Sequence, residues 1–276
     1  MSRSTALVTG GSSGIGFALC ESLLKAGWRV ITLSRQLMHS HPGFVRLNQT
    51  YSSDVFEVVQ CDLADLSSIR TTTSNLRRAN ITFDVLFNNA AVNLEHPKYT
   101  DDGLDYHCQV NVLAPYALIL GLLPSFRTGA TIINVSGLVV ELVRTLDLDQ
   151  LFGAHKHRRF FGSYAQSKLA MIALTQQLAR QFDGRLYFRA VDPGPTNTPL
   201  ARGHGMPTLL RPFYLLYKQP ARAAKQLMAA AFAPKFAKDN GIYISFGLNR
   251  SPPKSTTNHQ TQHGLITSLN DILINH

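Results

Sequence analysis

The sequence predicts an α/β protein, with a doubly wound parallel sheet in a single domain that spans residues 1–276. Three observations predict this fold. Short apolar runs alternate with helical stretches along the chain, the first apolar run leads directly into a glycine-rich turn, and no linker or internal repeat divides the 276 residues. A sheet of this kind binds its ligands at the carboxyl ends of its strands, so functional residues are expected there.

The expected elements follow one another in a regular order of strand and helix. Apolar, β-rich runs place strands at Ala6–Val8, Trp28–Leu33, Val55–Val59, Val85–Phe87, Thr131–Val135, Leu186–Val191 and Ile242–Phe246. Helical spacing places helices at Ile15–Ala26, Asp65–Ala79, Asp101–Leu123, Ser163–Phe182 and Ala221–Ala233. Beyond the last strand, Asn249–Gly264 is polar and contains prolines, which predicts a loose surface excursion over about residues 249–276.

The composition favours a soluble, intracellular protein. With 45% hydrophobic and 16% charged residues, the chain is too apolar and too weakly charged to be disordered. Three well-separated cysteines, Cys20, Cys61 and Cys108, exclude a disulfide scaffold and suit a reducing compartment. The longest nearly apolar run, Val112–Leu123, is too short to span a bilayer, and the first apolar stretch runs into glycines rather than a cleavage site. We therefore expect a cytoplasmic location.

The formal net charge of +10 suggests a nucleic-acid partner at first sight, but its distribution does not. Residues 193–238 and 151–161 contain no Asp or Glu, and together they hold ten of the 27 Lys and Arg residues. Without those ten, basic and acidic residues balance at 17 each. The excess is confined to two segments, so we expect no nucleic-acid partner.

A glycine-rich loop follows the first strand and opens the first helix. Its sequence is Thr9-Gly10-Gly11-Ser12-Ser13-Gly14-Ile15-Gly16. Glycines allow a tight turn and a close approach of the backbone to a pyrophosphate, which the positive end of the helix then stabilises. An ordinary glycine-rich turn is the alternative, but the position between strand and helix favours a dinucleotide site.

The ends of the second and third strands indicate which dinucleotide binds. The second strand ends at Arg35, where an acid would hydrogen-bond the adenosine ribose of NAD(H); an arginine offers a planar cation to the 2′-phosphate of NADP(H) instead. Asp62, with Leu63 after it, closes the third strand and could accept from the adenine amino group. A solvated arginine and a simple turn aspartate are the alternatives. We predict NADP(H) and no metal.

Further motifs follow in order along the chain. They are Asn88-Asn89-Ala90-Ala91, Asn111, Ile132-Ile133-Asn134-Val135-Ser136, Tyr164-x3-Lys168 and Pro193-Gly194-Pro195-Thr196-Asn197-Thr198. With these motifs the chain, from about Thr5 to Gly247, resembles the short-chain dehydrogenase/reductase family. The long insert between Ser136 and Tyr164 looks most like the retinol-dehydrogenase branch. The resemblance implies a Rossmann-type fold and NADP(H)-dependent interconversion of lipophilic carbonyls and alcohols.

The resemblance assigns the chemistry to Tyr164, Lys168, Asn111 and Ser136. Tyr164 and Lys168 share a helix face, so the ammonium of Lys168 can favour the phenolate of Tyr164. The resemblance assigns Tyr164 as general acid in reduction and general base in oxidation. Asn111 would support the proton relay through water, and Tyr214-x3-Lys218 has the same spacing but the wrong place in the order. The expected cofactor contacts are Gly10, Ser12, Ser13, Gly14, Ile15, Gly16, Arg35, Asp62, Leu63, Asn89, Ala90, Tyr164, Lys168, Pro193, Gly194, Thr196 and Thr198.

One position departs from the family pattern. The family usually has two serines at the end of the fifth strand, and the second hydrogen-bonds the substrate oxygen; here the pair is Ser136-Gly137. Neighbouring side chains on a strand point to opposite faces, so Ser136 cannot replace the missing hydroxyl without a twist or bulge. This departure leaves an alternative open, a nucleotide-binding protein with a non-redox acid–base activity (isomerisation or cyclisation) or a sensor role. Restoring serine at Gly137 separates the two.

The stretch at about 199–220 covers the substrate in this family. Here it carries aromatic and leucine residues with spaced cations. A hydrophobic small-molecule substrate is the main expectation, an anionic group on it is a second one, and peripheral contact with a membrane is a third. A helix packed on the core is the alternative for this segment. The resemblance also implies a homodimer through the helices that bear Asn111 and Tyr164.

Overall fold

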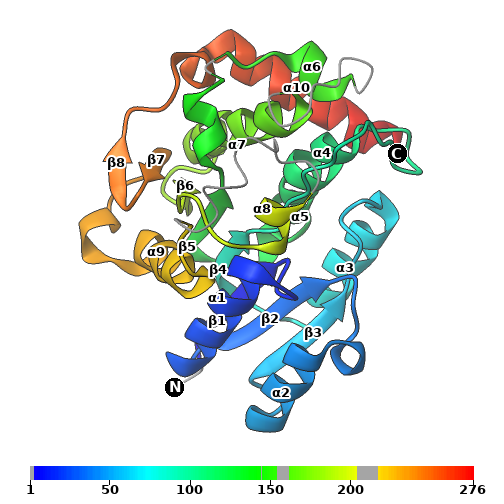
Figure 1. The fold of residues 1–276 in the computed structure, drawn as a ribbon, viewed down its shortest axis with the longest axis vertical. Helices are drawn as coiled ribbons and strands as arrows, with labels where there is room; N and C mark the ends of the chain where they lie inside the picture. Colours follow the sequence, from blue (N-terminus) through cyan, green and yellow to red (C-terminus); the bar gives the residue numbers. More distant parts are fainter. Residues whose placement is uncertain (1–2, 144, 154–161, 204–216) are drawn as a thin grey trace.

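Eight strands of the described residues form one sheet, with helices on both faces (Figure 1). The computed structural model describes residues 3–143, 145–153, 162–203 and 217–276. The strands are β1 Thr5–Thr9, β2 Arg29–Ser34, β3 Phe56–Gln60, β4 Phe83–Asn88, β5 Phe126–Val135, β6 Leu186–Asp192, β7 Ile242–Ser245 and β8 Leu248–Arg250. Their order is β3-β2-β1-β4-β5-β6-β7-β8, and only β8 is antiparallel to its neighbour. The predicted doubly wound parallel sheet is confirmed, with one unpredicted strand at its edge.

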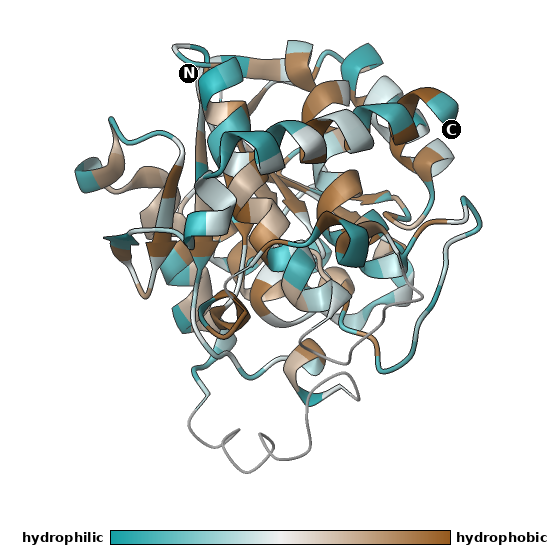
Figure 2. Cartoon of the chain, turned by 90° about the horizontal axis from the view of Figure 1, so that it is seen from above, coloured by the Kyte–Doolittle hydropathy of each residue, from teal (hydrophilic) through white to brown (hydrophobic). Residues whose placement is uncertain are grey.

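The helices pack in two layers around the sheet. They are α1 Gly14–Lys25, α2 Pro42–Thr50, α3 Leu66–Arg78, α4 Tyr106–Cys108, α5 Ala114–Gly121, α6 Leu148–Phe152, α7 Ser163–Gln181, α8 Pro199–Arg202, α9 Pro220–Phe232 and α10 His259–Asn275. One core forms between the sheet and α1, α2 and α9, and the other between the sheet and α3, α5 and α7. Because both faces are covered, β1 is buried along its whole length. Hydrophilic residues lie mainly on the outer helices and loops (Figure 2).

The helix expected at 101–123 begins later and changes its pitch. Its start is fixed by Asp105, whose carboxylate accepts hydrogen bonds from the backbone N–H groups of His107 and Cys108. After α4 the chain forms a π-helix, η2, over Gln109–Leu113, and α5 follows. Pro115 has no N–H to donate to the carbonyl of Asn111, four residues earlier, which accounts for the wider turn. Such π-turns are frequent at functional sites.

The C-terminal segment is not a loose excursion, so this expectation is wrong. The chain forms β8, then the 3₁₀ helix η8 at Lys254–Thr257, then α10. Leu265 and Leu269, four residues apart, are completely buried in the core that contains α5 and α7. The hydroxyl of Tyr116 on α5 donates to Asn270 at 2.7 Å. The helix α10 therefore lies across helices through which the family resemblance implies dimer formation.

A second unpredicted helix, α2, lies beside the loop that follows β2. It starts with Pro42 in the first turn, a favourable position for proline, after the N-cap residue His41. The imidazole Nδ1 of His41 accepts from the N–H of Phe44 at 3.3 Å, and its ring packs between those of Phe17 and Phe44. This helix places His41 at the edge of the nucleotide side of the cavity described below.

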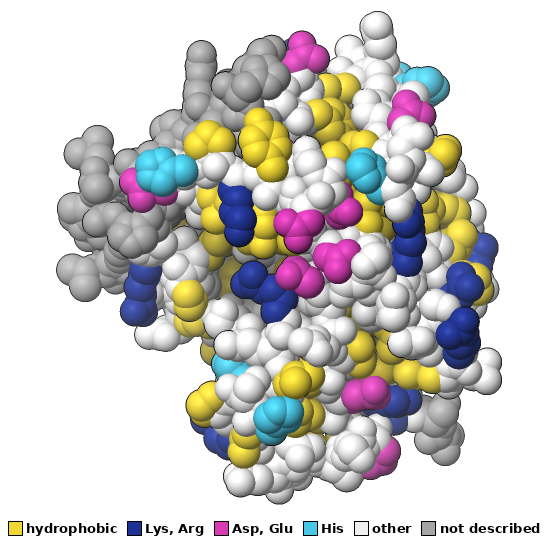
Figure 3. All heavy atoms as spheres, turned by 90° about the vertical axis from the view of Figure 1, so that its right-hand side faces the viewer, with side chains coloured by type: hydrophobic (Ala, Val, Ile, Leu, Met, Phe, Trp, Pro, Cys, Tyr) yellow, Lys and Arg dark blue, Asp and Glu magenta, His cyan; other side chains and the backbone are white. Residues whose placement is uncertain are grey.

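The basic excess falls partly on residues that the structure does not describe. Lys156, Arg158, Arg159 and Arg211 lie outside the described residues, as does most of the expected substrate cover, of which residues 199–203, with α8, and 217–220 are described. On the face drawn in Figure 3, acidic side chains gather near the middle, and Lys and Arg side chains lie around them. Among the described helices, none combines the length and apolarity needed to cross a membrane.

Candidate functional site

A cavity of about 1010 Å³ opens at the carboxyl ends of the strands, where the chain winds in opposite directions from β1 and β4. Most of the residues predicted from the sequence line it. They are Gly10, Ser12, Ser13, Gly14, Ile15, Arg35, Asp62, Leu63, Asn89, Ala90, Ser136, Tyr164, Lys168, Pro193, Gly194, Thr196 and Thr198. Gly16 and Asn111 do not line it. The motifs are far apart in the sequence, and the topology of the sheet brings them together in one site.

The glycine loop is shaped as a cradle that side chains would fill. Gly10 has a φ of +71°, and a Cβ on it would lie 2.9 Å from the Cα of Ala90. A Cβ on Gly16 would lie 2.2 Å from the carbonyl oxygen of Gly10, so Gly16 is needed for packing beneath the loop rather than for ligand contact. Ser13, the N-cap residue of α1, makes no side-chain capping bond, and the first turn has no acid. A pyrophosphate fits this helix end.

The residues that follow β2 and β3 shape the nucleotide side of the cavity. Arg35 is exposed, and its guanidinium forms no ion pair within the described residues, so it is available to a phosphate. The Ser34 hydroxyl accepts from the N–H of Gln36 at 3.0 Å and shapes the turn. The Asp62 carboxylate accepts from the N–H of Ala64 at 2.9 Å, and the carbonyl of Leu63 accepts from Gln109 at 3.3 Å. These bonds fix the backbone against which an adenine would lie.

The end of β4 is tied to β1 by polar groups. The Asn89 amide donates to the carbonyl of Thr9 at 2.9 Å, and the Thr9 hydroxyl accepts from the N–H groups of Asn89 and Ala90 at 3.0 Å. These hydrogen bonds fix the backbone at the base of the cavity, where the glycine loop turns over it. The sequence did not predict that Thr9 positions Asn89 and Ala90, both of which line the cavity.

Tyr164 and Lys168 lie on the first turns of α7, as their spacing predicts. The ammonium of Lys168 donates to the carbonyl of Val135 at 3.0 Å and lies 5.8 Å from the centre of the Tyr164 ring. Burial lowers the pKa of Lys168 to about 8, although the Asp192 carboxylate acts in the opposite direction. Burial also raises the pKa of Tyr164, and the charge of Asp192 adds to that increase. At pH 7 the Tyr164 phenol is therefore protonated, and Lys168, with a pKa of about 8, still carries its charge.

Ser136 braces α7 rather than facing a substrate. Its hydroxyl donates to the carbonyl of Lys168 at 3.0 Å. Gly137, the next residue, lies on the Tyr164 side: a Cβ on Gly137 would lie 3.9 Å from the Tyr164 hydroxyl oxygen. The alternation expected from the strand is therefore present, and the position that would carry a hydroxyl toward Tyr164 has no side chain.

Asn111 does not line the cavity, but it binds the backbone of Val92, which does. Its amide oxygen accepts from the N–H of Val92 at 2.8 Å, and its amide nitrogen donates to the carbonyl of Val92 and to the hydroxyl of Ser167, both at 3.0 Å. The side chain thus joins the segment after β4 to α7. Its position is set by the π-helix η2.

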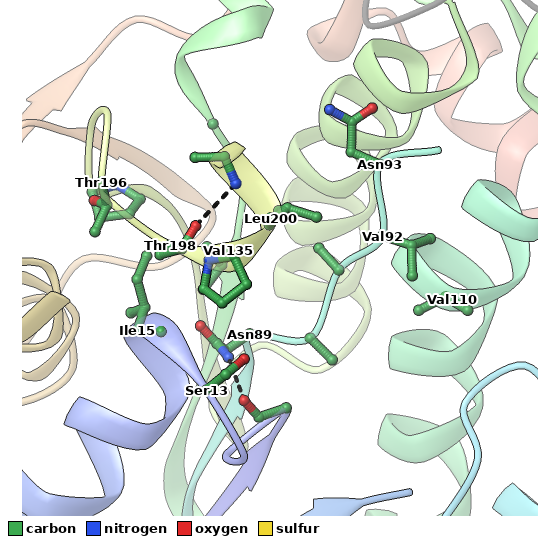
Figure 4. Close-up of a pocket in the computed structure, with 18 of the residues that line it drawn as sticks. Ser13, Ile15, Asn89, Val92, Asn93, Val110, Val135, Thr196, Thr198 and Leu200 are labelled. Carbon is green, nitrogen blue, oxygen red and sulfur yellow. Dashed lines mark hydrogen bonds between the residues drawn. The ribbon is translucent and has the colours of Figure 1, made fainter. Parts of the chain in front are cut away.

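The segment after β6 closes the cavity over the glycine loop. Gly194 has a φ of +77°, and its N–H donates to the Asp192 carboxylate at 2.8 Å. The Thr196 hydroxyl donates to the carbonyl of Gly194 at 2.9 Å. The Thr198 hydroxyl accepts from the N–H of Ala201 at the start of α8 (Figure 4), and its methyl group would lie 3.0 Å from a Cβ on Gly14. Both threonine hydroxyls are thus engaged with the backbone of this segment.

The other end of the cavity is apolar. Val92 and Val110 lie at this end, across the cavity from Ser13 and Ile15 of the glycine loop (Figure 4). Further apolar lining residues come from separate segments: Tyr106, Leu138, Val139, Leu142, Leu200 and Tyr217. Leu142, in the insert, remains exposed at the mouth. No local pattern marks these residues in the sequence, because apart from Leu138, Val139 and Leu142 they come from different parts of the chain.

Asp192 was not predicted as a site residue, although it precedes the Pro193-Gly194 turn. It is buried at the cavity wall, where burial raises its pKa against the opposing effects of the Gly194 N–H, the Ser245 hydroxyl and the charge of Lys218. The other ionisable groups that face it are Glu141 on η4, the 3₁₀ helix Leu138–Glu141, Tyr243 on β7, and Tyr164 and Lys168 on α7. The Asp192 carboxylate is thus close enough to the Tyr164–Lys168 pair for its charge to act on both groups.

Replacing Asp192 with asparagine should move the pH profile of carbonyl reduction to lower pH. Loss of the negative charge lowers the pKa of Tyr164 and of Lys168 alike, because the carboxylate raises both. In the role that the family resemblance implies for Tyr164, reduction needs a protonated phenol, so the alkaline fall in rate should begin at a pH about one unit lower. The measurement is kcat against pH for the two proteins, with NADPH saturating. An unchanged or upward-shifted profile would show that Asp192 does not act on this pair.

The sheet, the cradle and the cavity define a doubly wound nucleotide-binding protein, and comparison with known proteins specifies it. The sequence model of the short chain dehydrogenase family matches residues 4–145. Polyprenol dehydrogenase of Mus musculus is 30% identical over 272 residues, which cover 94% of this chain and 81% of that protein. Retinol dehydrogenase 13 of Homo sapiens is 30% identical over 260 residues, which cover 90% and 78% respectively.

A solved structure adds a likeness in three dimensions. A short chain dehydrogenase from Burkholderia cenocepacia J2315, in complex with NADP, matches with a TM-score of 0.68 and 25% identity over 88% of this chain and 96% of that one. The chain belongs to the short-chain dehydrogenase/reductase family of oxidoreductases, and its expected resemblance to the retinol-dehydrogenase branch is confirmed.

Proposed function

We propose that the protein is an NADP(H)-dependent oxidoreductase that interconverts a lipophilic carbonyl and its alcohol. The observation that carries the proposal is one cavity in which a glycine cradle, the Tyr164–Lys168 pair and an apolar wall meet. The relatives support the substrate class, because two of them are named for polyprenol and retinol, both lipophilic alcohols.

The chain's own residues would bind the nucleotide and move a proton. NADP(H), when bound, supplies or accepts the hydride. The cradle around Gly10 and Gly14 binds the pyrophosphate at the N-terminus of α1, and Arg35 binds the 2′-phosphate. Tyr164 donates its phenolic proton to the carbonyl oxygen in reduction and takes the hydroxyl proton in oxidation. Lys168 holds the phenolate by its charge, and the apolar wall keeps water from the reacting atoms.

A panel of lipophilic aldehydes and ketones tests this proposal. Retinal, long-chain aldehydes and polyprenals are incubated with NADPH or NADH, and the loss of nicotinamide absorbance is followed. Turnover with at least one of them, faster with NADPH, is expected. Tight NADPH binding without turnover on the whole panel would contradict hydride transfer and favour the non-redox alternative that Gly137 suggests.

Replacing Arg35 with alanine should weaken NADPH binding and leave NADH binding nearly unchanged. A charge-assisted contact to a phosphate contributes about 1.5–3 kcal/mol, so the Kd of NADPH should rise about tenfold to a hundredfold. The measurement is a fluorescence titration of each reduced nucleotide. Arg46 gives a matched control, because its guanidinium is exposed and pairs with Glu21 at 2.7 Å instead of lining the cavity. An equal loss for both nucleotides after the Arg35 change would contradict 2′-phosphate binding.

A further inference from the structure

The position of Gly137 leaves a substrate oxygen short of one hydrogen-bond donor. A Cβ there would lie 3.9 Å from the Tyr164 hydroxyl, so a serine at this position would hold its own hydroxyl beside the same substrate atom as the phenol does. Ser136 cannot supply the bond, because its hydroxyl donates to the backbone of Lys168 on α7. A donor for this oxygen must therefore come from another part of the cavity wall.

Asn93 has the properties of such a donor. Its side chain lines the cavity and is only 9% exposed, and its amide oxygen is buried without a hydrogen-bond partner. Within the described residues, no hydrogen bond involves its amide nitrogen either. Figure 4 shows Asn93 on the same segment as Val92, on the side of the cavity opposite Ile15. The amide nitrogen is therefore open to an acceptor on a ligand, and a substrate oxygen is such an acceptor.

The neighbours of Asn93 hold it in place on both sides. Val92 is bound through both its backbone N–H and its carbonyl to Asn111. The N–H of Leu94 donates to Nε2 of His107 at 3.0 Å. The ring of His107 packs edge-on against that of Tyr164, with 6.5 Å between the ring centres. The backbone of Asn93 is therefore fixed relative to the phenol, which a specific contact to a substrate oxygen requires.

We propose that Asn93 binds the oxygen of the substrate, donating from its side-chain amide the hydrogen bond that Gly137 does not supply. The inference rests on the proposed function in that the oxygen belongs to a lipophilic alcohol or carbonyl compound. Asn93 is then a residue that selects for an oxygen at this point in an otherwise apolar ligand. The nearly isosteric Asn93→Leu change removes the donor and keeps the bulk of the side chain.

Binding of all-trans-retinol and of anhydroretinol, its dehydrated hydrocarbon, tests the inference without turnover. Both are fluorescent and apolar, and only retinol carries an oxygen. The unchanged protein should bind retinol more tightly. In Asn93→Leu the Kd of retinol should rise about tenfold, the effect of one hydrogen bond, while the Kd of anhydroretinol stays the same. Equal changes for both ligands, or no preference for retinol in the unchanged protein, would overturn the inference.

Rescue separates a direct contact from a structural role. Adding Gly137→Ser to Asn93→Leu should restore retinol binding to within about threefold, because the new hydroxyl reaches the same oxygen. A loss caused by disturbed packing would not be restored by a change at Gly137, and absence of rescue would count against the contact. Retinol preference that depends on Asn93, in a protein that never turns over retinal, would support this inference and contradict hydride transfer. The two proposals can therefore fail separately.

Discussion

Changing Tyr164 to phenylalanine should reduce turnover at least about a hundredfold while NADPH still binds. In the proposed mechanism the substitution removes the phenolic proton that passes to the carbonyl oxygen, and general acid–base groups contribute about 10²–10⁴ in rate. The ring itself is retained, so its contacts with His107 and with the ammonium of Lys168 persist. The measurement is kcat with the best aldehyde of the panel, beside the Kd of NADPH by titration.

Two comparisons make this result interpretable. Tyr99→Phe removes a phenol that is half exposed and does not line the cavity, so its kcat should match that of the unchanged protein. The pH dependence of residual Tyr164→Phe activity should lose the limb that Asp192→Asn is expected to shift. If Tyr164→Phe retains most of its turnover, the proton comes from another group, and the proposed part of Lys168 in supporting a phenolate is wrong as well.

The cofactor side of the site could be predicted from the sequence because its residues are close together in short, ordered motifs. The glycine loop requires positive φ at Gly10 and Gly14, and glycine is the residue that adopts it freely. The residue types alone therefore indicate this backbone conformation. The same holds for Tyr164 and Lys168, which are one helical turn apart on α7. Local geometry determines both features, and local geometry is what a sequence pattern records.

The substrate side could not be predicted, because it is assembled by tertiary packing. Val92 follows β4, Val110 belongs to the π-helix, and Leu142 belongs to the insert after β5, so no spacing rule relates them. The helix α10 was missed for the same reason. Its sequence is mostly polar, and Leu265 and Leu269 become a buried face only because α7 and α5 are there to receive them.

The position of α10 also bears on the expected dimer. Its N-terminal turn contacts α7 through Gln262, which donates to Gln176 at 3.0 Å, and its later turns reach α5 through Asn270. A dimer formed directly through α5 and α7 would have to displace these contacts and expose Leu265 and Leu269. An interface that includes the outer face of α10 avoids that cost.

The largest effect on stability is expected at Arg189, a charged residue in the middle of an apolar strand. It lies on β6 and is only 2% exposed, and its guanidinium donates to the carbonyls of Ala230 and Ala231 at 2.7 and 3.0 Å. It also donates to the carbonyls of Phe236 at 2.5 Å and Asp239 at 3.2 Å. The side chain thus satisfies the last carbonyls of α9 and of the turn that follows, where the negative end of the helix dipole favours a cation.

Arg189→Met should lower the free energy of unfolding by about 3–5 kcal/mol, because several buried carbonyls lose their donor at once and methionine fills most of the space without replacing any of them. Urea unfolding of the nucleotide-free protein measures this. Arg185→Met is the matched control: it removes an exposed arginine that donates to one carbonyl, that of Leu123 at 2.9 Å, and should cost no more than about 0.5 kcal/mol. The chain passes from these carbonyls directly into β7. The variant should therefore also weaken this edge of the sheet, where the Ser245 hydroxyl donates to the Asp192 carboxylate. If Arg189→Met proves as stable as Arg185→Met, water must reach the end of α9, and the buried arginine is not what holds that helix to the sheet.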